Sequence, residues 1–211
     1  MSGFKYPDDI YTEPEDLDDN TLANLGPLTG MAGIWKGKKG MDVKPEADGP
    51  ARQEYVEHYE LQPIDPQTNG PQVLYGLRYH THIVKPGEVE MYHDQVGYWL
   101  WEPATGSVIQ TLAIPRGQIA MAVGKAAADA KTFELAAVRG STVNGICSNP
   151  FLESNFTTAD WRIKVTINGD GTWSYDQTTV LMIRGTQKFD HTDRNTLHKV
   201  GEPTPNPLAR G

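Results

Sequence analysis

The sequence contains a single cysteine, Cys147, and no long apolar run. One cysteine excludes an internal disulfide framework and any zinc site built from several cysteines. No segment approaches the roughly 18 apolar residues of a membrane-spanning helix, and the first residues hold no apolar signal core. We therefore expect a soluble, non-exported, cytoplasmic protein.

Basic residues are also scarce. Lys and Arg number 19 against 27 Asp and Glu, which gives a formal net charge of −8. This sign repels phosphate backbones and anionic membranes, so neither nucleic acid nor a membrane is an expected partner. The charge is concentrated in residues 1–20, where Lys5 is the only base. We interpret residues 1–21 as an acidic arm, residues 22–200 as a single β-barrel domain, and residues 201–211 as a proline-rich tail.

Sequence patterns of helical length are absent after residue 33, and the dominant hydrophobic period there is two. In residues 161–167, Trp161, Ile163 and Val165 share one face while charged residues occupy the other. The turn sequence Asn168-Gly-Asp-Gly171 ends this segment and a second one follows directly. The pattern predicts ten strands, at 33–43, 52–61, 72–83, 88–102, 107–114, 117–124, 132–138, 159–168, 171–184 and 190–200.

Short connections between these segments favour antiparallel pairing of sequential strands. Closing the sheet removes both exposed edges, so we predict an all-β fold: a ten-stranded antiparallel up-and-down barrel of the lipocalin or fatty-acid-binding-protein type. A β-sandwich is the alternative. Before the first strand, Leu22, Leu25 and Leu28 recur at helical spacing around Gly26-Pro27, which predicts a short N-terminal helical lid. A barrel of this width has room for a small-molecule ligand in its cavity.

Two histidine-containing segments in the middle of the chain are candidates for chemistry. His80 and His82 lie on one strand face about 7 Å apart, a spacing that can chelate a metal. Glu88 is too far along the chain to complete the motif of a cupin, so a solvent-facing or hydrogen-bonded histidine pair is the favoured interpretation. His93 and Asp94 point to opposite faces, and we interpret them as a partnered surface pair rather than an acid and base.

The last predicted strand contains His191 and His198, which lie on opposite faces, so only one of them faces inward. A lone inward imidazole in an apolar cavity suits an iron ligand, because its second nitrogen can be held by a neighbouring acceptor. The alternative is a histidine that closes the barrel through hydrogen bonds.

Three places in the chain together resemble the nitrobindin family, which consists of haem-binding barrels also found as the C-terminal domain of a human THAP-type protein. The first is Gly33-x-Trp35-x-Gly37, the second is the segment from His93 to Tyr98, and the third is His191 followed by Leu197. The resemblance covers most of residues 25–200. It implies haem b as cofactor, His191 as the metal ligand, and Gly33, Trp35 and Gly37 as further cofactor-site residues. It also implies reactivity toward nitric oxide and isomerisation of peroxynitrite to nitrate, with no catalytic residue assigned beyond these.

The chain departs from the family pattern at several positions. The family signature continues with a third glycine two places after Gly37. In this chain that position is Lys39, and Gly40 stands one place later. His191 stands six residues before Leu197 where five are expected, so we predict an extra residue, such as a bulge, that keeps His191 inward. Without it, Thr192 would take the inward position. Further departures are residues 43–46 and two insertions, at 62–72 and 140–158.

Two other functions remain open. One is a carrier of an apolar small molecule such as a fatty acid, without haem. Its carboxylate anchor would be Arg184 or Arg194, since no arginine here is followed two places later by tyrosine. The other is a barrel filled by its own aromatic side chains. A second copy of the chain is an open alternative as a partner, which would make a homodimer.

Overall fold

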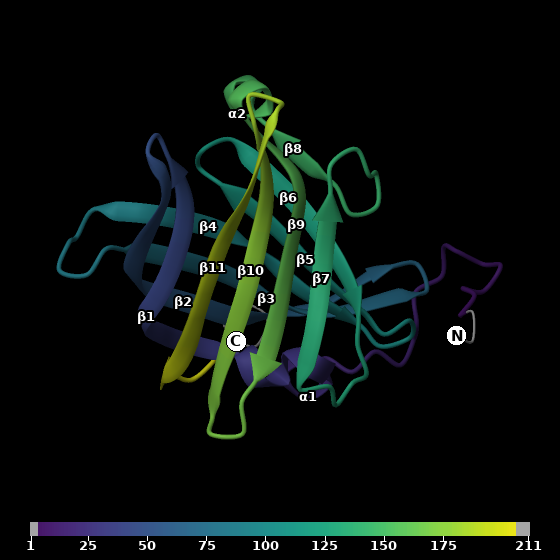
Figure 1. Cartoon of the computed structure of the whole chain (residues 1–211). Coiled ribbons are helices and arrows are strands. Elements are labelled where there is room, and N and C mark those ends of the chain that lie inside the picture. Colours follow the sequence, from purple (N-terminus) through teal and green to yellow (C-terminus); the bar gives the residue numbers. More distant parts are fainter. Residues whose placement is uncertain (1–3, 206–211) are drawn as a thin grey trace.

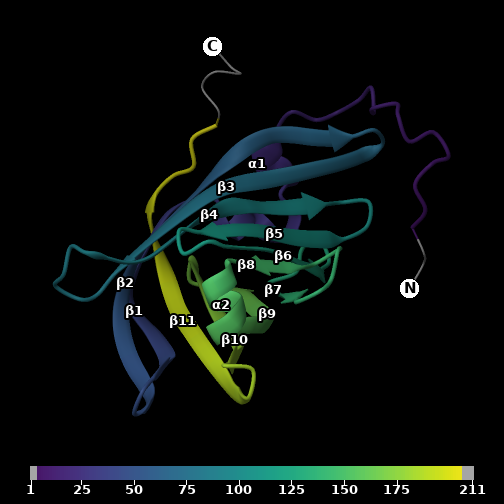
Figure 2. The ribbon, with the colours of Figure 1, turned by 90° about the horizontal axis from the view of Figure 1, so that it is seen from above.

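The structure is a computed structural model that describes residues 4–205, and it consists of one closed antiparallel barrel. The barrel strands are β1 (Gly33–Glu46), β2 (Gly49–Asn69), β3 (Gln72–Val84), β4 (Met91–Glu102), β5 (Ser107–Ile114), β6 (Gln118–Lys125), β7 (Thr132–Val138), β9 (Phe156–Ile167), β10 (Thr172–Ile183) and β11 (Gln187–Gly201). Figures 1 and 2 show them wrapping around a common interior. The predicted ten-stranded barrel is confirmed, and the sandwich alternative is wrong.

The ten barrel strands follow one another around the barrel in the order of the chain, and the first pairs with the last. The order is β5-β4-β3-β2-β1-β11-β10-β9-β7-β6, and pairing of β5 with β6 closes the ring. Between β6 and β7 only Val123 and Ala136 are paired. The short strand β8 (Ile146–Ser148) instead pairs with the start of β6. The barrel is therefore held least tightly at the joint between β6 and β7.

The two predicted insertions have different structures. Residues 62–72 are no separate loop, because β2 continues to Asn69 and pairs with β3 as a longer hairpin. Residues 140–158 contain β8 and the short helix α2 (Pro150–Asn155), neither of which the hydrophobic period had indicated. Asn149 caps this helix, because its side chain accepts hydrogen bonds from the backbone N–H groups of Phe151 and Leu152. α2 lies at one end of the barrel (Figure 1).

The opposite end is closed by the N-terminal helical turns α1 (Thr21–Asn24) and η1 (Gly26–Met31), as predicted. Leu25, Leu28 and Met31 are fully buried there, within one core that includes Trp35. The indole N–H of Trp35 donates to the carbonyl of Met31 at 2.7 Å, which ties the lid to the first strand. Burial of each of these side chains stabilises the fold by about 1.5–3 kcal/mol, so this end of the barrel is filled by packed side chains.

The described residues at the two ends, 4–20 and 202–205, add no strand to the barrel. Residues 4–20 form no helix or strand, and Tyr6 hydrogen-bonds to Glu102 at the β4–β5 turn. Of the predicted proline-rich tail, residues 206–211 lie outside the described residues. Within residues 4–205, no helix is long and apolar enough to span a membrane.

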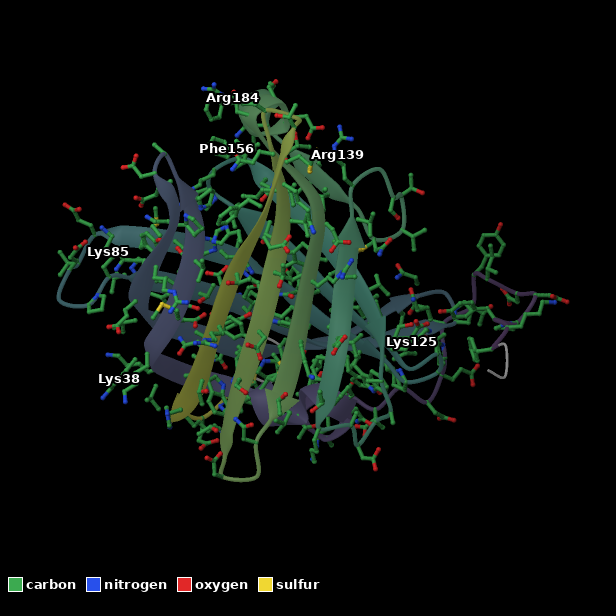
Figure 3. All side chains as sticks on the ribbon, viewed as in Figure 1. Lys38, Lys85, Lys125, Arg139, Phe156 and Arg184 are labelled. Carbon is green, nitrogen blue, oxygen red and sulfur yellow. The ribbon has the colours of Figure 1, made fainter. Side chains whose placement is uncertain are left out.

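A one-residue bulge in β1 decides which side chains of that strand face inward. Gly37 pairs with Glu57, but the next pair toward Tyr55 is formed by Gly40 rather than Lys39. Lys38 points to solvent (Figure 3), and the inward positions become Gly40 and Asp42. The shifted third glycine of the motif is thus explained, because the bulge moves Gly40 into the place that residue 39 would otherwise occupy.

Gly40 should tolerate no side chain. A Cβ there would lie 2.1 Å from the ring of Tyr55, so we expect Gly40→Ala to lower the free energy of unfolding by about 1–3 kcal/mol in urea denaturation. Gly169→Ala is the matched control, because a Cβ at Gly169 has no atom within 4 Å and should cost less than about 0.5 kcal/mol. Equal losses in the two variants would contradict this account of the bulge.

Candidate ligand-binding site

A cavity of about 390 Å³ occupies the half of the barrel toward α2. This volume lies in the range of small-molecule and cofactor sites, roughly 300–1,000 Å³. Its apolar wall includes Leu112, Ile163 and Leu181, with Leu152 of α2 and Phe156 toward the end of the barrel where α2 lies. The barrel is thus not filled by its own aromatic side chains, and that alternative is wrong.

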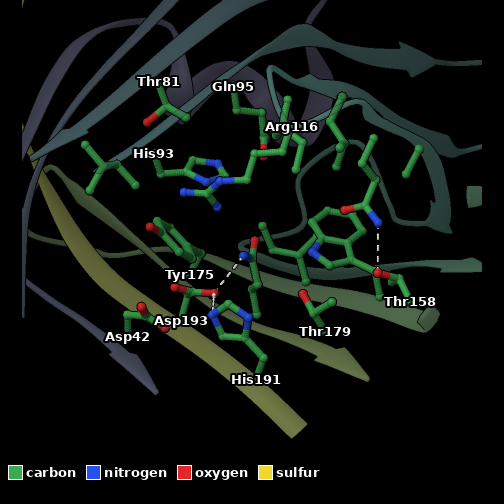
Figure 4. A pocket seen from close by; sticks show the side chains of 18 of the residues that line it. Asp42, Thr81, His93, Gln95, Arg116, Thr158, Tyr175, Thr179, His191 and Asp193 are labelled. Atoms are coloured by element: carbon green, nitrogen blue, oxygen red, sulfur yellow. Dashed lines mark hydrogen bonds and ion pairs between the residues drawn. The ribbon is translucent and has the colours of Figure 1, made fainter. Parts of the chain in front are cut away.

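One side of the cavity is polar, and its centre is His191 on β11. Its Nε2 lies 2.7 Å from Oδ1 of Asp42 on β1 and 3.6 Å from Oδ2 of Asp193 on β11. Figure 4 shows His191 and Asp193 facing each other on this side, with His93 and Arg116 opposite. Asp42 and Asp193 are largely buried, with side-chain exposures of 5% and 18%. The predicted inward placement of His191 is therefore what the structure has.

The bulge expected between His191 and Leu197 is absent, however. β10 and β11 pair without a register shift from Ile183–Gln187 to Thr172–His198. His191 nevertheless faces the cavity, because six residues is an even number and places it on the same face as the buried Leu197. Thr192 consequently faces away. The prediction that His191 needs a bulge in its own strand was wrong; the bulge lies in β1, where it turns Asp42 toward His191.

A second bulge, in β4, brings two consecutive residues to the cavity. Ile83 pairs with His93, but Val84 pairs with Met91, so Tyr92 is the extra residue. Tyr92 and His93 both line the cavity, and the Tyr92 hydroxyl donates a hydrogen bond to Oδ2 of Asp42. The interpretation of His93 and Asp94 as a surface pair was therefore wrong for His93, although the two do point to opposite faces.

The charges around His191 are strongly coupled. Burial acts to lower the pKa of His191, but the hydrogen bond with Asp42 and the charge of Asp193 outweigh it and raise that pKa above 6.5. Burial acts to raise the pKa of Asp42, yet the hydrogen bonds from His191 and Tyr92 hold it below its usual range. Burial is also the main reason that the pKa of Asp193 rises to about 6. This arrangement favours the protonated form of His191 between two acidic side chains.

The motif glycines support a hydrogen-bond network behind this cluster. Glu57 is fully buried, and its carboxylate accepts hydrogen bonds from Thr81 at 2.8 Å and from Tyr175 and Asn195 at 2.9 Å each. Burial raises the pKa of Glu57. A Cβ at Gly37 would lie 2.1 Å from Nδ2 of Asn195, so the glycine makes room for the amide that satisfies Glu57.

The other predicted site residues lie away from the ligand space. Trp35 packs edge-on against Trp173 with ring centroids 6.2 Å apart, and Gly33 lies at the start of β1. Neither these two nor Gly37 lines the cavity, so the structure supports no direct ligand contact for them. Arg184, at the β10–β11 turn, and Arg194 are exposed and do not line it either, so the proposed carboxylate anchors were wrong.

The cations that do line the cavity are Arg116 and Lys44. Arg116 lies in the β5–β6 turn, and its guanidinium donates to the carbonyl of Tyr92 at 2.8 Å. Sequence reasoning missed it, and the only signal was the turn sequence Pro115-Arg-Gly117 between two strands. Together with burial, Arg116 lowers the pKa of His93 to about 4, so His93 is neutral at pH 7.

Comparison with known proteins places this barrel in a family. A family model described as the THAP4-like, heme-binding beta-barrel domain matches residues 24–199. The chain belongs to this family. No curated protein matches the sequence. Among solved structures, the crystal structure of Rv2717c from M. tuberculosis is similar, with a TM-score of 0.60 and 24% identity over 88% of this chain and 99% of that chain. At this identity the likeness shows the fold alone.

The side chains that line the cavity are chemically suited to a haem. The cavity holds an imidazole donor, an apolar wall, and two cations that can pair with carboxylates. Oε1 of Gln110 and Nε1 of Trp173 are buried in the cavity lining and have no hydrogen-bond partner among residues 4–205. The cavity therefore offers one acceptor and one donor to a ligand. One condition applies: Nε2 of His191 is engaged by Asp42, so coordination through Nε2 must displace that carboxylate. Asp42, His191 and Asp193 also offer three ligand atoms within 4.8 Å of one another, as a divalent metal ion requires.

The protonation of His191 predicts a pH dependence of stability. Its pKa is raised in the folded state, so the stabilisation it provides is complete below about pH 6.5 and is lost as the pH rises through the folded-state value. In haem-free protein, the free energy of unfolding from urea titrations should fall as the pH rises above about 6.5. Asp193 titrates below this window, at about 6. The fall should be absent in His191→Gln, and an equal slope in that variant would contradict the assignment.

Proposed function

We propose that this protein binds haem b in the barrel cavity, where His191 would hold the iron, and that it isomerises peroxynitrite to nitrate. The observation that carries the proposal is the inward position of His191 in a cavity of a haem-binding family barrel. A bound haem supplies an iron able to react with nitric oxide and peroxynitrite. The reaction itself rests on the family resemblance.

The residues of this chain have separate roles in the proposal. His191 holds the iron, and Arg116 and Lys44 are the cavity cations able to neutralise the carboxylates of the cofactor. The apolar wall that includes Leu112, Ile163 and Leu181 keeps water away from the reacting species. Asp42 governs His191, because the carboxylate decides whether its imidazole carries a proton or is free to bind metal.

A haem-free carrier of an apolar small molecule is the second candidate. It is favoured by one observation, that Nε2 of His191 lies 2.7 Å from Asp42 and is not free. In that function the cluster of Asp42, His191 and Asp193 would meet a polar group of the ligand, while the same apolar wall would hold its hydrocarbon part. Reconstitution with haemin separates the two candidates.

Reconstitution with haemin tests the proposed cofactor. We expect a Soret band from the wild type, and quenching of tryptophan fluorescence because Trp99, Trp161 and Trp173 line the cavity. In His191→Ala the Soret band should stay at the position of free haemin, and haem affinity should fall at least tenfold. His198→Ala, on the exposed face of β11, should change neither the Soret band nor the affinity. Circular dichroism verifies folding of each variant. A folded wild type without a Soret band overturns the proposal and leaves the carrier.

Asp42 should oppose haem binding at neutral pH. Replacing it by Asn removes a hydrogen bond to a charged group, worth about 1.5–3 kcal/mol, so Asp42→Asn should bind haemin about tenfold more tightly at pH 7. Since the imidazolium must lose its proton before it binds iron, wild-type affinity should rise with pH, and this rise should move to lower pH in the variant. Weaker haem binding by Asp42→Asn would show instead that the carboxylate supports the ligand.

The reaction is tested separately by stopped flow. The haem-loaded wild type should accelerate peroxynitrite decay and raise the yield of nitrate, and the rate should fall to that of free haemin in His191→Ala. Unchanged decay with a normal Soret band would mean that the protein stores or carries haem without catalysing this isomerisation.

A further inference from the structure

Half of the histidines in the chain lie on the outer face of β2 and β3. These three are His58, His80 and His82, out of 6 histidines in the sequence. His80 and His82 are separated by one residue on β3, so their rings share a face, and the ring centroids are 6.4 Å apart. Their side chains are 49% and 40% exposed. Both imidazoles are therefore accessible from solvent.

A carboxylate from the neighbouring strand completes the group. Asp94 on β4 pairs with His82 in the ladder. Its Oδ2 lies 2.8 Å from Nε2 of His80 and 3.5 Å from Nδ1 of His82. One carboxylate oxygen thus faces a nitrogen of each ring, and the three ligand atoms all lie within 4.8 Å of one another. Asp94 faces outward because its neighbour His93 faces the cavity.

These separations are close to those a bound ion needs. Ligand atoms about 2.0–2.1 Å from a tetrahedral ion lie about 3.3 Å from one another. The distances from Oδ2 of Asp94 to the two imidazole nitrogens, 2.8 and 3.5 Å, lie on either side of that value. Because β3 and β4 are paired without interruption from Tyr75–Trp101 to Ile83–His93, the backbone holds the three residues in place before any ion binds.

The residues that border His80, His82 and Asp94 show which side chains belong to the group. His58 on β2 lies opposite His82, and Glu60 lies opposite His80, so both border the group. Lys36 on β1 lies opposite His58, and its charge opposes a cation at that end. The group therefore centres on His80, His82 and Asp94, away from the repulsion of Lys36.

We propose that His80, His82 and Asp94 form a binding site for one divalent transition-metal ion of the zinc class on the outside of the barrel. Two imidazole nitrogens and one carboxylate oxygen are the donor set that Zn²⁺ accepts, and solvent supplies its remaining ligand. The ion bridges β3 and β4. The site is separate from the cavity, since His80 and Asp94 point away from the interior and none of the three lines it.

Calorimetric titration of the full, haem-free chain with ZnCl₂ tests the site. We expect one equivalent of Zn²⁺ with micromolar affinity, and at least a tenfold loss of affinity in His82→Ala and in Asp94→Asn. His198→Ala is the matched control, because it removes an exposed histidine from another strand and should bind as the wild type does. Zn²⁺ should also raise the melting temperature of the wild type but not of His82→Ala. Substitution of the exposed His82 and His198 should be tolerated.

Two further variants distinguish Zn²⁺ binding at the outer site from haem binding in the cavity. Asp42→Asn should leave Zn²⁺ binding unchanged, and loss of binding in that variant alone would assign the ion to the cavity and overturn the outer site. Double substitution of His80 and His82 by Ala should leave the haemin spectrum intact, whatever the haem test gives. Wild-type stoichiometry in the double variant, or no binding to the wild type at 100-fold excess of Zn²⁺ over protein, overturns the proposal.

Discussion

The contact on which the cavity depends is the ion pair between His191 and Asp42, 149 residues apart in sequence and 2.7 Å apart in the barrel. It joins the first and last strands on the inside of the barrel, where β1 and β11 pair. Burial alone would strip the proton from His191 and favour the neutral form of Asp42. Their mutual contact reverses both tendencies. The chemical state of the cavity therefore follows from this pair.

The pair exists because two strands depart from strict alternation. Without the bulge after Gly37, the inward side chains of β1 would be Lys39 and Met41, and Asp42 would face solvent. Without the bulge at Tyr92, the hydroxyl that holds Asp42 from the other side would be lost from the cavity. Bulges are common next to functional sites because one extra residue re-aims a side chain. Here two of them converge on a single carboxylate.

Each face of β4 supplies one candidate site. His93 points inward beside Arg116, and Asp94 points outward between His80 and His82. The inner site is partly buried, and its charged groups lie on the cavity wall. The outer site is exposed and fixed by the pairing of β3 with β4. The wall of a barrel one residue thick thus separates two chemistries that can be tested independently.

The sequence alone predicts the barrel, because period-two hydrophobicity and short turns leave few ways to bury so many strands. It predicted the edges of β5 and β7 without error and the inward face of the last strand. It also placed the helical turns that close one end. What it left undecided were the contacts between distant strands: the partner of His191, the cation Arg116, and the meeting of Asp94 with His80 and His82. These contacts depend on the register of the strands. A single extra residue in one strand changes the register, but it leaves the composition and the hydrophobic period of the sequence almost unchanged.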